Sequence, residues 1–224
     1  MLLVMFDIDG TLTETMKVDE ECFVRSFKDV FGFADIDTDW SQYRRTTDSG
    51  IFHDVFTSRI GRSPTAQEVS QFRRHFIQLL TAASSQSPFA PVAGADRLLS
   101  RLAQGGSHRV SLATGGWRDS ARLKMASAGM CFDDHPAASA DDALDRESIM
   151  RLSRQRAAER YGELFACTVY VGDGVWDARA CRNVGIGTGS RATRLSAEGA
   201  VCVYPDFSDA DIFLRSVHEI TNAA

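Results

Sequence analysis

Three short, largely apolar runs, each ending at a polar turn, constrain the fold of this chain more than any other feature. They occupy residues 2–6, 109–113 and 168–171, and they end at Asp7, at Thr114-Gly115-Gly116 and at Gly172-Asp173-Gly174. Runs of this kind are typical of strands buried on both faces of a parallel sheet. A helical pattern follows each run, as in open α/β sheets, where sites form at the carboxyl ends of the strands. The pattern predicts an α/β fold with a Rossmann-like parallel sheet.

The segment between the first two runs has a different pattern. Residues 15–88 contain no convincing strand, but helical periodicity appears at 18–31, at 50–60 and after Ser63-Pro64. Ser63 is expected to cap the third of these helices, with Pro64 in its first turn. We therefore predict an α/β core domain of residues 1–14 and 89–224, and an inserted all-helical domain of residues 15–88.

Composition limits the classes of binding partner and the cellular compartments that are expected for this chain. The 224 residues carry a net charge of -5 and no block of Lys and Arg, so no nucleic-acid partner is expected. No run approaches the length of a membrane span, and no membrane association is expected. The five cysteines are scattered without C-x-x-C spacing, which favours reduced thiols in a cytoplasmic protein.

Two acids follow the first strand. Asp7 and Asp9 alternate along an extended backbone and point the same way, and Gly10 lets the chain turn sharply away. Two carboxylates at a strand end can bind Mg²⁺, and one of them can attack phosphorus. Taken alone, the same residues also fit a strand followed by a turn with two solvated acids.

The other two strand ends carry complementary groups. The hydroxyl of Thr114 and the backbone N–H groups after it suit a phosphate oxygen, although Thr is also a common helix cap. Asp173 and Asp177, on a loop entering a helix, could complete an oxygen-rich Mg²⁺ site or only cap that helix. The functional interpretation depends on all three clusters occurring together and in this order.

This combination resembles the haloacid dehalogenase superfamily. That family has an Asp-x-Asp-x-Thr motif, a Ser or Thr after the second motif strand, a Lys or Arg, and a Gly-Asp-x-x-x-Asp motif. The chain reads DIDGT at residues 7–11, Thr114 after its second strand, and GDGVWD at residues 172–177. The resemblance spans nearly the whole chain, and the helical insertion looks like the type 1 cap of phosphoglycolate-phosphatase-like members.

The resemblance implies a role for each motif residue. Asp7 resembles the nucleophile and a metal ligand. Asp9 resembles the general acid and base, with its backbone carbonyl on the same metal. Thr114, together with Gly10 and Gly115, would hold the phosphoryl group.

The metal site follows from the same resemblance. Asp173 would bind Mg²⁺ directly or through water, beside Asp7 and Asp9. Asp177 would orient the groups around the metal. The expected cofactor is therefore Mg²⁺.

The basic residue of the motif set has two candidates. Arg146 precedes the helix expected at 147–161, which is where the family places this residue, although the family more often has Lys there. The competitor, Lys124, is expected to be a solvated position on an earlier helix. We favour Arg146, because a guanidinium matches phosphate geometry well.

A polar loop in the insertion could select the substrate. Residues 44–50 fall between two expected helices, and in members with a type 1 cap such a loop faces the active site. Arg45, Thr47 and Asp48 are therefore candidate substrate contacts. An ordinary surface loop is an equally good interpretation of these residues.

The leading functional hypothesis is a Mg²⁺-dependent phosphatase that hydrolyses small phosphomonoesters through an aspartyl phosphate on Asp7. Its partner would be a small phosphorylated metabolite, such as a phosphoglycolate-like compound or a sugar phosphate; the oligomeric state is left open. A phosphomutase of the same fold is the alternative, since the motifs do not separate the two. A dehalogenase is disfavoured because those enzymes generally lack the second motif Asp, and a receiver-type phospho-switch is disfavoured because its acidic pair precedes the phosphorylated Asp by a full βαβ stretch.

Overall fold

The computed structural model describes residues 1–180 and 183–222, and it confirms the predicted fold class. Its six described strands form one parallel sheet in the order β3-β2-β1-β4-β5-β6. The strands are β1 (Leu2–Phe6), β2 (His108–Ala113), β3 (Ala137–Ala138), β4 (Cys167–Gly172), β5 (Asn183–Ile186) and β6 (Cys202–Tyr204). The strands expected at 109–113 and 168–171 are slightly longer than predicted, and the strand expected at 2–6 has the predicted bounds.

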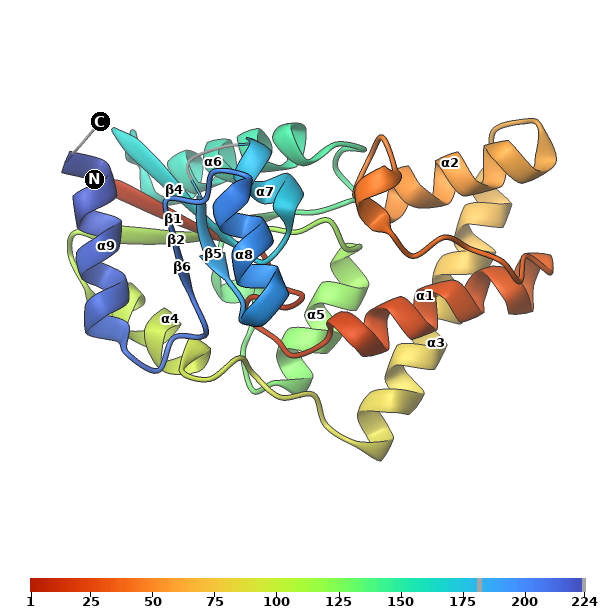
Figure 1. Ribbon diagram of the computed structural model, residues 1–224, viewed down its shortest axis with the longest axis horizontal. Helices are drawn as coiled ribbons and strands as arrows, with labels where there is room; N and C mark the ends of the chain where they lie inside the picture. Colours follow the sequence, from red (N-terminus) through yellow and green to blue (C-terminus); the bar gives the residue numbers. More distant parts are fainter. Residues whose placement is uncertain (181–182, 223–224) are drawn as a thin grey trace.

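Helices cover both faces of this sheet (Figure 1). They are α4 (Ala95–Gln104), α5 (Arg118–Ser127), α6 (Arg146–Tyr161), α7 (Val175–Ala180), α8 (Gly189–Ala197) and α9 (Ala210–Asn222). Val4 and Phe6 of β1 pack with α4, α5 and α9 on one face, whereas Leu3 and Met5 pack with α6 on the other. Because successive side chains of a strand point to opposite faces, the continuous apolar run of β1 fills both layers.

Three helices form the insertion between β1 and α4. They are α1 (Met16–Phe31), α2 (Asp48–Ile60) and α3 (Ala66–Gln86), and they lie beyond one end of the sheet in Figure 1. Their facing sides bury a cluster rich in phenylalanine, including Phe27, Phe52 and Phe72, which we call the cap core. Burial of each such ring contributes about 2–3 kcal/mol, so the insertion has a hydrophobic core of its own.

The start of α3 differs from the prediction. Ser63 is not the cap; Thr65 is the N-cap residue, and its side chain accepts a hydrogen bond from the backbone N–H of Glu68. The Glu68 carboxylate accepts one in return from the backbone N–H of Thr65, at 2.7 Å. This reciprocal capping box satisfies two backbone donors and starts the helix at Ala66, two residues later than a Ser63 cap would.

The chain crosses between the sheet and the insertion at two adjacent places. The backbone N–H of Glu14 donates to the carbonyl of Ala90 at 2.9 Å, and that of Val92 donates to the carbonyl of Leu12 at 3.0 Å. The outgoing and returning segments are therefore tied to each other close to the end of β1. The predicted division at 14/15 and 88/89 falls beside this crossing and stays a prediction.

Two further features concern the chain as a whole, namely the length and polarity of its helices and the state of its cysteines. Among residues 1–180 and 183–222, every helix is too short or too polar to cross a membrane. The thiols of Cys22, Cys131, Cys167 and Cys202 are free, and Cys181 lies outside the described residues.

Candidate active site

The acids after β1 sit on a tight turn at the carboxyl edge of the sheet. Asp7 continues the strand, since its backbone N–H donates to the carbonyl of Val171 at 2.9 Å. Gly10 then adopts φ +69°, and the backbone N–H groups of residues 11–13 turn back to the carbonyl of Ile8. A Cβ at position 10 would also overlap Asp173 Oδ2. Glycine is required here both for the left-handed turn and for the close approach of that carboxylate.

Arg146 is bound to Asp7. It begins α6, whose N-cap Asp145 accepts a hydrogen bond from the backbone N–H of Ser148. The guanidinium spans both Asp7 oxygens, with Nη2 at 2.9 Å from Oδ2 and Nη1 at 3.4 Å from Oδ1. Nη2 also lies 3.5 Å from Asp177 Oδ1, and both acids are buried. This bidentate contact fixes the orientation of the Asp7 carboxylate.

The prediction that Lys124 is exposed to solvent is wrong. Its side chain on α5 is 0% exposed, and Nζ lies 2.8 Å from Asp9 Oδ2. The same ammonium pairs with Asp19 on α1. Burial alone would lower the pKa of Lys124, but the charges of Asp19 and Asp9 outweigh burial and raise it. Both basic candidates therefore lie in the site: Arg146 contacts Asp7, and Lys124 contacts Asp9.

Asp9 is oriented by two donors. Lys124 binds Oδ2, and the Thr15 hydroxyl donates to Oδ1 at 2.6 Å. Thr15 is also the N-cap residue of α1, so the first insertion helix starts directly from the residue that holds this carboxylate. The Asp9 side chain thus faces the insertion, whereas the Asp7 side chain faces Arg146.

Three buried carboxylates gather beside the turn. Asp7, Asp173 and Asp177 each offer an oxygen within 4.8 Å of the others. Burial raises the pKa of Asp177 to about 7, although Arg146 opposes the change. Burial and the charge of Asp7 raise the pKa of Asp173 well above its usual value. Burial is the largest cause of both shifts, because it disfavours the charged form of a carboxyl group.

This cluster has the donor set of a divalent cation site. In the part of the chain that the structure describes, Asp173 Oδ2 is buried and accepts no hydrogen bond, although Arg191 Nη1 lies 3.2 Å away. Carboxylate oxygens are the ligands that hard cations such as Mg²⁺ prefer. The residues present therefore fit a divalent metal. The Asp9 carboxylate is engaged by Lys124 and Thr15 and is not part of this group of oxygens.

The turn after β2 faces the same site. Thr114 is buried, its backbone N–H donates to the carbonyl of Ala138, and its hydroxyl accepts from the N–H of Gly116 at 3.0 Å. A Cβ on Gly115 would lie 3.1 Å from Cζ of Arg146 and 3.0 Å from the carbonyl oxygen of Thr46. The glycine therefore lets the guanidinium and the insertion loop approach the backbone closely.

The three loop candidates of the insertion lie in different places. Asp48 is buried and accepts a hydrogen bond from the backbone N–H of Trp117 at 2.9 Å, and its own N–H donates to Gly115. Thr47 caps α2 and donates its hydroxyl to the carbonyl of Leu144 at 2.8 Å. Arg45 pairs with Asp54. Of the three, only Asp48 lines the cavity described next.

A cavity of about 110 Å³ joins the motif residues to the insertion. Asp7, Asp9, Thr114, Arg146 and Asp173 line its core side. Asp19, Glu20, Phe23, Trp40 and Asp48 line the insertion side. Trp176 also lines it, and its indole Nε1 is a buried donor without an acceptor within the described residues. The arrangement can hold a small molecule between the motif acids and Arg146 on one side and the acids and rings of the insertion on the other.

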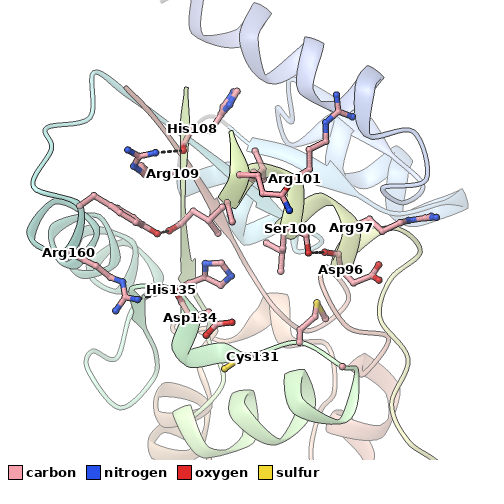
Figure 2. A pocket seen from close by; sticks show the side chains of 18 residues that line it. Asp96, Arg97, Ser100, Arg101, His108, Arg109, Cys131, Asp134, His135 and Arg160 are labelled. Carbon is pink, nitrogen blue, oxygen red and sulfur yellow. Dashed lines mark hydrogen bonds between the residues drawn. The ribbon is translucent and has the colours of Figure 1, made fainter. Parts of the chain in front are cut away.

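A larger cavity of about 1110 Å³ lies elsewhere, between α4, the start of β2 and the segment around His135 (Figure 2). Its wall includes Arg97 and Arg160, but none of the motif residues. Size alone would favour it as a binding site. The smaller cavity is the stronger candidate, because the buried titratable groups converge there.

Comparison with known proteins places this site in a family. The model of the haloacid dehalogenase-like hydrolases matches residues 1–185. The chain belongs to this family. No match was found among curated proteins. This dehalogenase-like hydrolase thus has the α/β fold class that its sequence predicts.

Solved structures share the fold of this hydrolase. A hydrolase from Pseudomonas syringae is 19% identical with a TM-score of 0.73, over 95% of this chain and 97% of that chain. A predicted phosphoglycolate phosphatase from Haemophilus somnus is 16% identical with a TM-score of 0.63, over 95% and 97%. A putative β-phosphoglucomutase from Bacteroides vulgatus is 18% identical with a TM-score of 0.66, over 98% and 89%.

Several residues of the hydrolase site were not predicted from the sequence, among them Thr15, Asp19, Glu20 and Arg191. Asp19 and Glu20 lie in a helix whose apolar side is easy to recognise, and nothing in the local sequence marks these acids as lining the same cavity as Asp9. Arg191 belongs to α8, which packs against β5 and β6, and its Nη1 lies 3.2 Å from Asp173 Oδ2. Their convergence is a product of the tertiary fold.

Proposed function

We propose that this hydrolase is a Mg²⁺-dependent phosphatase of small phosphomonoesters. The observation that carries the proposal is the separation of Asp7 and Asp9 into two environments beside one cavity. Arg146 holds Asp7, and Lys124 with Thr15 holds Asp9. Two adjacent carboxylates with different partners suit a division between nucleophile and acid-base catalyst.

In the first half of the reaction, an oxygen of Asp7 attacks phosphorus and the ester bond to the leaving group breaks. Asp9, in its protonated form, gives its proton to the departing oxygen. The phosphoryl oxygens are held by Thr114, the backbone around Gly115 and the Arg146 guanidinium, which all line the cavity. The product of this half is an acyl phosphate on Asp7 and a free alcohol.

In the second half, Asp9 accepts a proton from water as the water attacks the phosphorus of the acyl phosphate. Inorganic phosphate leaves and the Asp7 carboxylate is restored. Asp7 and Asp173 would hold the Mg²⁺, with the Asp9 carbonyl, and Asp177 would orient this group. Bound there, the metal would supply positive charge against the phosphoryl oxygens.

A phosphomutase remains the alternative. It would use the same residues but return the phosphoryl group to a sugar instead of to water. The small cavity and the absence of further Lys or Arg side chains from its described wall favour hydrolysis of a small ester. Release of inorganic phosphate separates the two functions.

The first test measures phosphate release from p-nitrophenyl phosphate with Mg²⁺ and with EDTA. We expect activity only with Mg²⁺, and a loss of roughly 10³-fold or more in Asp7→Asn, because the amide cannot act as the nucleophile. Asp133→Asn replaces an exposed acid and serves as the matched control. Full activity in Asp7→Asn would rule out the proposed nucleophile, and no release across a broad panel of phosphomonoesters would rule out the phosphatase.

A further inference from the structure

We propose that the alcohol released by this enzyme carries an ammonium group and that esters with a second anionic group are rejected. The inference rests on the proposed phosphatase function and concerns the part of the substrate that lies beyond the phosphoryl group. The ligand class is the phosphate ester of a small amino alcohol. It differs from the phosphoglycolate-like class that the family resemblance implies.

The insertion side of the cavity is acidic. Asp19 and Glu20 reach it from the first two turns of α1, and Asp48 reaches it from the start of α2. Asp19 is only 19% exposed and Asp48 is 9% exposed, so water screens these carboxylates weakly. A group placed there meets acidic oxygens from two separate helices.

The cations near the cavity do not balance these acids. Arg146 is bound to Asp7 on the phosphoryl side. Lys124 is fully buried behind the wall and is shared between Asp9 and Asp19. Among the described residues that line the cavity, no other Lys or Arg is present. Asp19 is paired with Lys124, but the described residues give no salt bridge to Glu20 or Asp48. A carboxylate or second phosphate on the leaving group would face these two acids, whereas an ammonium would be paired.

Aromatic rings complete the wall around these acids. Phe23, Trp40 and Trp176 line the same cavity. The indole Nε1 of Trp40 donates to Glu20 Oε2 at 2.8 Å, which fixes this carboxylate at the edge of the Trp40 ring. Rings and carboxylates together are the usual surroundings of a bound ammonium group, since the ring face attracts a cation.

The size of the cavity limits the leaving group. A volume of about 110 Å³ is well below that of typical ligand pockets. It suits a two-carbon or three-carbon alcohol better than a sugar. The probes can therefore be close in size and differ chiefly in the charge of the alcohol part.

The test compares phosphoethanolamine, ethyl phosphate and phosphoglycolate as substrates in the presence of Mg²⁺. We expect kcat/KM to fall in that order, with phosphoethanolamine favoured over phosphoglycolate by about tenfold or more. In Glu20→Gln this ratio should shrink several-fold. Glu21→Gln, an exposed neighbour on the same helix, should keep the wild-type ratio.

A binding measurement makes the inference independent of turnover. Calorimetric titration of Asp7→Asn with phosphoethanolamine and with phosphoglycolate should show the same preference, because the insertion side is unchanged. Equal or tighter binding of phosphoglycolate would overturn the inference, even if hydrolysis of p-nitrophenyl phosphate supports the phosphatase. Preferential binding of phosphoethanolamine without any hydrolysis would support the ligand class and count against the phosphatase.

Discussion

At the scale of single residues, Lys124 connects the two halves of the molecule. It extends from α5 of the core, contacts Asp9 on the turn after β1 and pairs with Asp19 on the first insertion helix. A buried cation between two carboxylates contributes little net stability while it is present, because its desolvation is costly. Its removal leaves two acids close together without compensation.

We expect Lys124→Met to lower the free energy of unfolding by about 3–5 kcal/mol. Methionine preserves most of the length and volume of the side chain, so the loss would come from the uncompensated carboxylates. Urea denaturation followed by circular dichroism measures the change. Lys28→Met, an exposed lysine on α1, is the control and should be close to neutral.

The double variant Lys124→Met with Asp19→Asn isolates the electrostatic cause. If repulsion between the acids causes the loss, removing one of them should restore part of the stability. A single Lys124→Met variant as stable as the wild type would show that the pair is not coupled to folding.

The motif acids were predictable from sequence, and Lys124 was not. Asp7, Asp9 and Asp173 follow apolar strands, so their place at one sheet edge follows from the pattern. Lys124 does lie on the buried stripe of α5, at spacings of three and four from Ala121 and Ala128. That signal was available, but long lysine side chains usually extend from such positions to water. Only its acidic partners, from two other segments, explain why it stays buried.

At the scale of elements, the capping of α3 shows how local signals compete. Ser63-Pro64 and Thr65-x-x-Glu68 both predict a helix start within two residues of each other. The structure uses the second, because Glu68 closes the reciprocal pair of hydrogen bonds with Thr65. Choosing between them from sequence would have required the capping box to be given more weight than the Ser-Pro pattern.

We expect Thr65→Ala to destabilise the protein by about 1 kcal/mol, because the N-cap hydrogen bond to Glu68 is lost. Ser63→Ala should have a much smaller effect. Thermal or urea unfolding of both variants measures the difference. A larger loss in Ser63→Ala than in Thr65→Ala would contradict the assignment of the cap.

At the scale of the whole molecule, one tryptophan connects the core and the insertion. Trp117 precedes α5 of the core but packs in the cap core against Phe23, Phe72 and Phe76, with ring centroids 5.9 Å apart in each pair. Its indole N–H donates to Ser49 at 2.7 Å, at the start of α2. The insertion is therefore held to the core by a buried aromatic contact as well as by the chain itself.

We expect Trp117→Ala to cost about 3–5 kcal/mol and to loosen the insertion more than the sheet. Hydrogen exchange should show faster exchange in α1, α2 and α3 than in β1 and β4. Phe165→Ala truncates a buried ring on the α6 face of the sheet and is the matched control. Equal acceleration throughout the molecule in Trp117→Ala would show that the insertion and the core unfold as one unit.

The overall architecture was predictable to the level of fold class, but the sheet order was not. Apolar runs and helical periodicity indicate alternating strands and helices and an all-helical insertion. The position of β1 between β2 and β4 depends on contacts between segments more than 100 residues apart, which no local pattern encodes. The site lies at this central position because the turns after all three strands meet there.

The paired crossing between Leu12–Glu14 and Ala90–Val92 has a consequence for the history and engineering of such a chain. The two segments are hydrogen-bonded to each other. The two ends of the insertion are therefore held close together by the core, independently of the length or sequence of the insertion. The entropy cost of closing a longer or shorter insertion grows only slowly with its length. Insertions of different size can therefore be exchanged at this position. Substrate selectivity can change in this way while the structure of the sheet stays the same.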